Sequence, residues 1–378
     1  MKNWLVSIFF ISASSLPVSQ KPSSAPPFST AENIIIITLD GFRWQELFMG
    51  ADSLLLSDNN YTPGVEISNA MFGGSSSAIR REKLMPFFWN IIAKKGQLYG
   101  NRQLNSKMNV GNAYSISYPG YNEMFTGNTD MMIASNRKYN NPNVNVLEWL
   151  DTKEEFKGKV AAFTSWDVFP FILNKKRNDL PINSGYAECE SGEMLTKLQD
   201  NGVYDKKATR YDELTFVAAK EYLQQFKPRV LYLGLGETDE FAHDGRYDLY
   251  LQKANAADRM IAMLWQWVQT TEGYKDNTIF IITTDHGRGK KKGKWASHGS
   301  MIAGSSEVWM AVMGPGLEPL GEVKDGEQIY LQQVAQTIAN LLGEEFIPGQ
   351  PVADAITLPM KSKTSPGDEV LLATTIDK

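Results

Sequence analysis

The stretch Thr278-Ile-Phe-Ile-Ile-Thr-Thr-Asp-His-Gly287 joins a continuous apolar run to a carboxylate and an imidazole. A short, apolar and β-branched run of this kind predicts a strand that is buried on both faces. Asp285 and His286 would then stand at the carboxyl end of the strand, which is where open α/β sheets bind their ligands. Another histidine, His298, follows, with eleven residues between it and His286.

Similar apolar runs alternate with helical patterns along most of the chain. Residues 33–40, 228–235 and 307–314 each read as a strand, while residues 212–225 and 247–270 have helical spacing. Strands that alternate with helices favour an α/β fold with a mostly parallel central sheet and helices on both faces. With 42% hydrophobic residues, the chain has enough apolar side chains for a sizeable core.

The first twenty residues have the features of a secretory signal peptide. A positive start, Met1-Lys2, is followed by an apolar run at 4–13 and then by small and polar residues. The run is too short to span a bilayer, and no later stretch is long and apolar enough, so we expect no membrane span after signal removal. These features predict a secreted or periplasmic protein.

The rest of the chain divides into a linker, one large domain and a tail. Residues 21–32 are rich in serine and proline and read as a linker, and residues 33–350 read as the catalytic domain. Within it, the irregular and polar residues 174–210 are a candidate cap or lid. Residues 351–378 are expected to form a C-terminal tail.

Composition limits the classes of function that fit the chain. The formal net charge of -5 gives no sign of a nucleic-acid-binding surface. The single cysteine, Cys189, stands between two glutamates, which disfavours the thiolate form and a nucleophilic role. We therefore do not expect nucleic acid as the main partner.

Two further predicted strands end in possible metal ligands. Asp40 ends the predicted strand at 33–40, and Asp239 and His243 follow the predicted strand at 228–235 at a spacing that puts both on one face of a helical turn. Singly, each has an ordinary explanation: Asp40 as a turn or capping residue, and the Asp239–His243 pair as a solvated helix face. Jointly, the three histidines of the chain and three aspartates at successive strand ends suit two Zn²⁺ or similar ions.

Ser117 offers a hydroxyl group to the same chemistry. Pro119 fits the first turn of a helix and Gly127 fits the position after its end, so Ser117 stands at the helix N-terminus. That end of a helix favours anions, and a metal ion bound to the hydroxyl would activate it as a nucleophile. The alternative is an ordinary helix cap.

Four motifs carry a family resemblance. They are Ile34-Ile-Ile-Ile-Thr-Leu-Asp-Gly-Phe-Arg43, Ser117-Tyr-Pro-Gly-Tyr121 with Thr126-Gly127, Asp239-x-x-x-His243, and Thr284-Asp-His-Gly287. In this order they resemble the alkaline phosphatase superfamily, with the type I phosphodiesterase/nucleotide pyrophosphatase branch as the most similar part. The resemblance covers residues 33–345 and implies an alkaline phosphatase-like fold.

The resemblance also implies a ligand set and a mechanism. One metal ion would be held by Asp239, His243 and His298, and a second by Asp40, Asp285 and His286. The cofactors would therefore be two divalent metal ions, with Zn²⁺ as the expected metal. Ser117 would be both a ligand and the nucleophile, and hydrolysis of a phosphodiester or nucleotide-type substrate would pass through a phosphoserine. The resemblance further implies Asn136 as a contact to a small anionic phosphate-ester substrate. Arg288 is a second candidate contact, because it lies two residues after His286.

Two departures from the branch keep alternatives open. The loop between His286 and His298 is short, as in phosphomutase-type members and small bacterial hydrolases of the superfamily. The Cys/Ser-x-Pro-x-Arg signature of sulfatases is absent. The alternatives are a phosphomonoesterase of the alkaline phosphatase type, a sulfate or phosphonate ester hydrolase, and a non-catalytic metal-binding module of the cell envelope.

Overall fold

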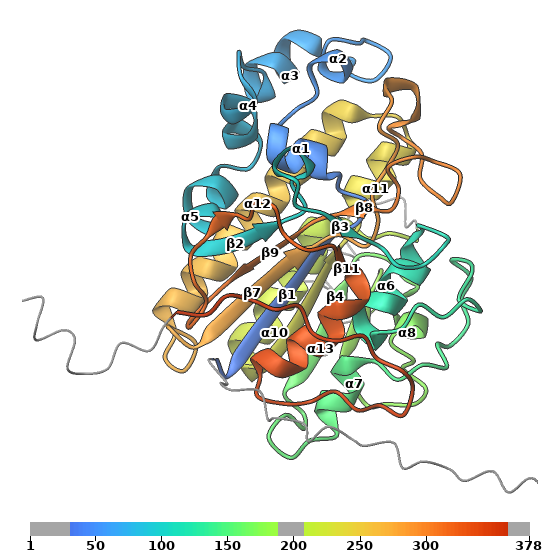
Figure 1. The fold of residues 1–378 in the computed structure, drawn as a ribbon, viewed down its shortest axis with the longest axis vertical. Helices are drawn as coiled ribbons and strands as arrows, with labels where there is room; N and C mark the ends of the chain where they lie inside the picture. Colours follow the sequence, from blue (N-terminus) through green and yellow to red (C-terminus); the bar gives the residue numbers. More distant parts are fainter. Residues whose placement is uncertain (1–30, 188–207, 362–378) are drawn as a thin grey trace, which may run out of the picture.

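The computed structural model describes residues 31–187 and 208–361 and is built on an eight-stranded sheet (Figure 1). From one edge to the other the strands are β10 (Gly321–Glu322), β2 (Gly96–Tyr99), β9 (Met310–Met313), β7 (Thr278–Thr283), β1 (Asn33–Leu39), β6 (Val230–Leu235), β4 (Val160–Thr164) and β5 (Ile182–Ser184). All neighbouring pairs are parallel except those made by β9, so the sheet is mostly parallel, as predicted.

The central strand β1 aligns the carboxyl ends of its two neighbours. Ile37 of β1 lies opposite Ile282 of β7 and Leu233 of β6, and every residue of the three strands is buried. In parallel pairing the three strands end at one edge of the sheet, and the loops that follow them meet there. This register brings together the polar residues that follow β1, β6 and β7.

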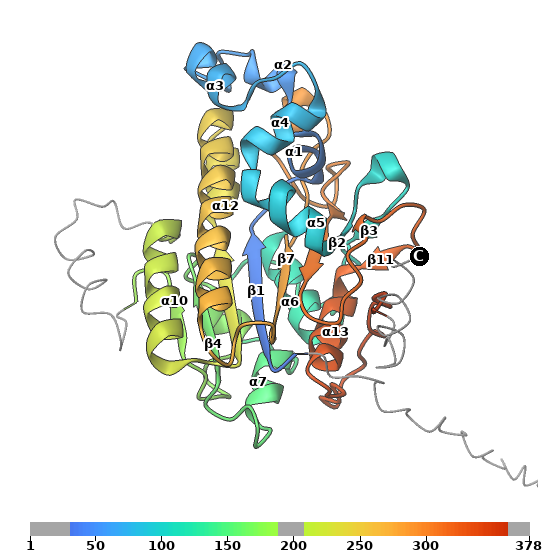
Figure 2. The same cartoon turned by 90° about the vertical axis from the view of Figure 1, so that its left-hand side faces the viewer.

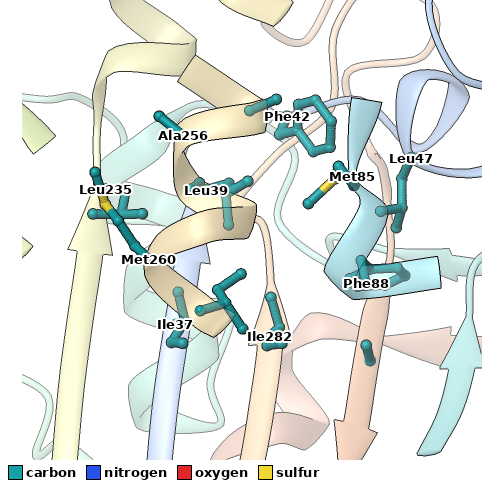
Figure 3. Close-up of a cluster of buried hydrophobic side chains, with 14 of the residues drawn as sticks. Ile37, Leu39, Phe42, Leu47, Met85, Phe88, Leu235, Ala256, Met260 and Ile282 are labelled. Atoms are coloured by element: carbon teal, nitrogen blue, oxygen red, sulfur yellow. The ribbon is translucent and has the colours of Figure 1, made fainter. Parts of the chain in front are cut away.

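Helices cover both faces of the sheet (Figure 2). Alternate residues of β1 point to opposite faces, so the strand contributes to a hydrophobic core on each side. Ile35 and Ile37 pack into one core with helices on their side, part of which Figure 3 shows. Ile34 and Ile36 pack into the other. The first core contains α1 (Trp44–Met49), α2 (Ser53–Leu56), α3 (Val65–Phe72), α4 (Ser77–Leu84), α5 (Ala93–Lys95), α10 (Asp212–Phe226), α12 (Tyr247–Thr270) and a π-helical segment (Phe88–Ile92), and the second contains α6 (Ser117–Thr126), α7 (Val146–Asp151), α8 (Phe169–Ile172) and α13 (Val334–Leu341).

Residues 307–314 do not form one strand, and this prediction is wrong in detail. Glu307–Val308 is β8 of a separate small sheet, in which it pairs with β3 (Met108–Asn109), itself beside β11 (Ile329–Tyr330). Trp309 separates β8 from β9, since its indole N–H donates to the Phe42 carbonyl and its own carbonyl accepts from Thr283. These two bonds turn the chain from one sheet to the other.

The candidate cap is only partly described. Within it, Ile182–Ser184 forms β5 and pairs with β4 at the edge of the central sheet, so these residues belong to the sheet and not to a lid. Residues 188–207 of the candidate cap, which include Cys189, lie outside the described residues, as do the predicted signal peptide and most of the linker. Among residues 31–187 and 208–361, no helix is both long and apolar enough to cross a membrane.

Part of the predicted tail runs along the body of the protein. The backbone N–H of Ala353 donates to the carbonyl of Gly127, and Met360 forms a bridge with Leu317. Residues 362–378 lie outside the described residues. The segment 351–361 therefore closes over the end of α6.

Candidate metal centre and nucleophile

Three loops at the carboxyl edge of the sheet bring six possible ligands into two groups. In each group the ligand atoms lie within 4.8 Å of one another. The inner group is Asp40, Asp285 and His286, and the outer group is Asp239, His243 and His298. Asp40 follows β1, Asp285 and His286 follow β7, and α11 (Glu237–His243) follows β6. The division is the one that the resemblance implies, although the metal-binding role of each residue stays a prediction.

The inner group is buried, and each of its carboxylates has one oxygen paired and one unpaired. Tyr121 donates its hydroxyl to Asp40 Oδ2 at 3.0 Å, and the backbone N–H of Gly41 donates to Asp285 Oδ1 at 3.0 Å. Asp40 Oδ1 and Asp285 Oδ2 have no hydrogen-bond partner, and each lies 3.5 Å from Nε2 of His286. Buried oxygens without a partner are costly, and a bound cation would satisfy both.

Burial shifts the pKa of each inner residue toward its uncharged form. Burial and the neighbouring Asp285 raise the pKa of Asp40, and burial raises that of Asp285 to about 7. Burial lowers the pKa of His286 to about 4, and its Nδ1 lies 2.9 Å from the Gly287 carbonyl. A hydrogen on Nδ1 leaves the Nε2 lone pair facing the two carboxylates, which is the donor set that Zn²⁺ prefers.

The outer group is more open to solvent. His243 Nε2 lies 3.1 Å from Asp239 Oδ2 and 3.0 Å from His298 Nε2, and the His243 side chain is half exposed. Burial, helped by the nearby His286, lowers the pKa of His298 to about 3. His298 Nδ1 lies 3.2 Å from the Ser115 carbonyl, which turns its other nitrogen toward His243. Two imidazoles and a carboxylate again suit a divalent ion.

Ser117 is the first residue of α6, and its side chain points at the inner group. Its Oγ lies 3.3 Å from His286 Nε2, and the residue is buried. The helix reaches this position because Gly120 has no side chain: a Cβ there would lie 2.3 Å from the Asp285 carbonyl oxygen. Gly127 ends the helix at φ 70°, as the sequence predicts. The hydroxyl and the positive end of α6 thus meet at one point.

The two predicted substrate contacts differ in their surroundings. Asn136 Oδ1 accepts the backbone N–H of Tyr118 at 2.9 Å, so Asn136 lies beside the start of α6. Arg288 is buried and donates to the carboxylate of Asp239 and to the Ala296 carbonyl. Arg288 therefore braces the outer group in this structure, and its contact with a substrate phosphate stays a prediction.

Sequence reasoning overlooked the residues that hold the ligands in place. Tyr121 fixes Asp40 through its hydroxyl, and Thr238 donates to the Asp40 carbonyl at 2.6 Å. Glu123 accepts backbone N–H groups of the loop before α6. The only signal in the sequence was Glu123, a glutamate inside a predicted helix. The sequence alone does not show which segment of the chain this glutamate contacts.

Comparison with known proteins supports the resemblance. Residues 182–345 match the family model described as the Metalloenzyme superfamily. None of the curated proteins matches the chain significantly. Among solved structures, the chain resembles wild-type alkaline phosphatase PafA with a TM-score of 0.56 at 10% identity, covering 86% of this chain and 98% of that one.

Two other solved structures have the same architecture. A 2-O GAG sulfatase, BT1596, matches with a TM-score of 0.56 at 11% identity, over 86% of this chain and 73% of that one. The lipoteichoic acid synthase LtaP from Listeria monocytogenes matches with a TM-score of 0.53 at 15% identity, over 86% and 74%. At these identities the likeness establishes the alkaline phosphatase-like fold, which confirms the predicted fold class.

Proposed function

We propose that this chain, which has the alkaline phosphatase-like fold and matches a metalloenzyme family model over residues 182–345, is a metal-dependent hydrolase of phosphate esters. Two divalent ions, Zn²⁺ in first place, would occupy the inner and outer groups. Ser117 would be the nucleophile and would carry the phosphoryl group as a phosphoserine. The preferred substrates would be phosphodiesters or nucleotide-type esters.

One observation carries the proposal: the buried hydroxyl of Ser117 faces His286 beside two carboxylate oxygens that have no partner. A serine that served only as a helix cap would precede the helix and accept a backbone N–H. Ser117 is instead the first residue inside α6, after the N-cap Ile116, and its hydroxyl lies beside His286. Divalent ions held by the inner and outer groups would supply Lewis acidity that favours the serine alkoxide and stabilises the leaving oxygen.

In the proposed reaction, Ser117 attacks the phosphate ester and water then hydrolyses the phosphoserine. The oxygen of Ser117 forms a bond to phosphorus as the bond to the leaving oxygen breaks. The leaving oxygen takes the bonding electron pair and a proton, which balances the proton that Ser117 gives up, and departs as an alcohol. Water then adds to phosphorus as the bond to Ser117 breaks, and one of its protons restores the hydroxyl, so that a diester and water give an alcohol and a phosphate monoester. The N-terminus of α6 and Asn136 lie where they can orient the phosphate during both steps.

Our preference for diesters rests on two cations that already have carboxylate partners. Arg288 is engaged by Asp239, and Lys138, two residues beyond Asn136, lies 2.6 Å from Asp167. Because these cations already have partners, less positive charge is left to balance the substrate. A diester with one negative charge needs less of it than a monoester with two. The monoesterase alternative draws support from Lys138 itself, whose partly exposed side chain could turn to a second charge.

Export is a further part of the proposal and rests on the sequence of residues 1–20. Mass spectrometry of the native protein recovered from its source tests it. A mature chain that begins near residue 21 agrees with export, whereas a mature chain that still begins at Met1 contradicts it.

A substrate panel tests the proposed activity. Zinc-loaded protein is compared on bis-p-nitrophenyl phosphate, p-nitrophenyl phosphate and p-nitrophenyl sulfate, with bound zinc measured in the same sample. We expect the diester to have the highest kcat/KM and Lys138→Ala to lower only monoester turnover. A preferred monoester that depends on Lys138 favours the alternative, and turnover of no ester favours a binding module.

A further inference from the structure

Glu123 is a buried carboxylate that the proposed chemistry does not use. It lies on the second turn of α6, six residues after Ser117, and has no exposed surface. Its oxygens accept the backbone N–H of Gly111 at 2.9 and 3.0 Å and that of Asn112 at 2.8 Å. Among residues 31–187 and 208–361 no cation forms an ion pair with it.

The loop that Glu123 holds leads directly into the site. Asn112 Oδ1 accepts the backbone N–H groups of Tyr114 and Ser115, each at 2.9 Å. Ser115 has a φ of +51°, in the left-handed region that residues with a side chain rarely adopt. Its conformation therefore depends on these bonds, and it lies two residues before Ser117.

The same loop also reaches the outer group. The carbonyl of Ser115 lies 3.2 Å from Nδ1 of His298. A bond from the Nδ1 hydrogen to that carbonyl fixes both the tautomer and the direction of the ring. One carboxylate thus acts on the nucleophile and on an outer ligand through a single loop.

We infer that Glu123 is a positioning residue that holds residues 111–115 so that Ser117 and His298 keep their places in the site. The inference rests on the proposed function for its consequence in turnover, although its effect on His298 does not. Burial raises the pKa of Glu123 to about 8, although the hydrogen bonds from Gly111 and Asn112 lower it. The protein thus has an acidic side chain at a position where burial disfavours the charged form.

Glu148 provides a matched control. It is a buried glutamate that also accepts a backbone N–H, that of Asn145 at 2.7 Å, as part of the capping box of α7. It pairs with Arg177 and forms no bond to residues 111–117. Loss of either carboxylate removes support from a local turn, but only Glu123 connects to the site.

The experiment compares Glu123→Gln with Glu148→Gln. Both oxygens of Glu123 accept backbone N–H groups of Gly111 or Asn112. In glutamine one of these oxygens is replaced by an NH2 group, which cannot accept, so at least one of these hydrogen bonds is lost. We expect Glu123→Gln to lower kcat on bis-p-nitrophenyl phosphate about 10- to 100-fold with KM nearly unchanged, because a small misplacement of the nucleophile is costly. Zinc release from the outer group to a chromogenic chelator should become about 10-fold faster. Glu148→Gln should change neither.

The outcomes separate this inference from the proposed function. If wild-type protein turns over the diester and Glu123→Gln has the same kcat and zinc release, Glu123 is not a positioning residue. Equal losses in both glutamine variants also overturn the inference. If wild-type protein hydrolyses no ester, the proposed function fails and zinc release alone decides the role of Glu123.

A second pair of variants serves if Glu123→Gln does not fold. Asn112→Ala removes the acceptor for Tyr114 and Ser115, while Asn112→Asp keeps an oxygen at the same place. We expect Asn112→Ala to show the loss of kcat and the faster zinc release, and Asn112→Asp to stay close to wild type. Equal behaviour of the two variants contradicts a relay through this loop.

Discussion

The hydroxyl of Ser117 lies 3.3 Å from Nε2 of His286, although 169 positions separate the two residues. The contact arises because α6 packs directly onto the end of β7, where Gly120 leaves room for the Asp285 carbonyl. The hydroxyl of Ser117 is thus placed at the inner group by helix packing and needs no movement to reach it. Such preorganisation lowers the cost of reaching a reactive geometry.

Gly41 should be intolerant of a side chain. It has a φ of +57°, and a Cβ would lie 2.8 Å from Asp239 Oδ1 and 3.1 Å from a ring carbon of His286. We expect Gly41→Ala to lower kcat/KM about 100-fold, because both groups must shift. Steady-state kinetics on the diester measures the loss.

Gly158 separates backbone strain from the clash at the site. It has a φ of +70°, and a Cβ there would meet no atom within 4 Å. Gly158→Ala should cost about 1–2 kcal/mol of unfolding free energy, as expected for the left-handed region, without loss of kcat/KM. A similar loss of activity in both variants would contradict a specific clash at Gly41.

Removal of metal should proceed in two phases. The inner residues are almost wholly buried, whereas the His243 side chain of the outer group is 50% exposed. We expect a chelator to take the outer ion first and the inner ion more slowly, and His243→Ala to abolish only the fast phase. Stopped-flow detection of the zinc–chelator complex measures both phases, and a single phase with two ions per chain would contradict the expectation.

Glu123 should make stability depend on pH. The pKa of Glu123 is about 8 in the fold, against the ordinary glutamate value of 4.5, so between these values the folded protein binds a proton that the unfolded chain has released. The stabilisation is fully present below pH 4.5 and is lost as the pH rises through 8. We expect the unfolding free energy of wild type to fall relative to Glu123→Gln from pH 5 to pH 8 in urea titrations. A difference that stays constant with pH would show that the carboxyl is not buried in this way.

The fold and the meeting of the candidate ligands could be predicted because their signals are local. Buried parallel strands read as continuous apolar runs, and three of these runs lead into residues whose chemistry suits a metal. Parallel pairing then places the three strand ends at one edge, so Asp40, Asp239 and Asp285 were expected to meet. The small number of histidines, three in the chain, made their shared position informative.

Other features depend on contacts between distant segments. The break at Trp309 requires a bond to Phe42, and strand β5 is three residues long in a polar stretch, so neither has a pattern of its own. Glu123 shows its role only through the loop that it binds, and Arg288 shows its partner only once α11 and the loop after β7 are in place. Residues of this kind are found from geometry.

The turnover of Ser117→Ala tests the central claim most directly. Zinc-loaded wild type and Ser117→Ala are compared on bis-p-nitrophenyl phosphate, with zinc per chain measured in each. We expect the variant to lose activity by about 10³-fold or more while keeping both zinc ions, since the six ligands of the inner and outer groups remain. A Ser117→Ala protein that hydrolyses the diester at the wild-type rate would contradict the account.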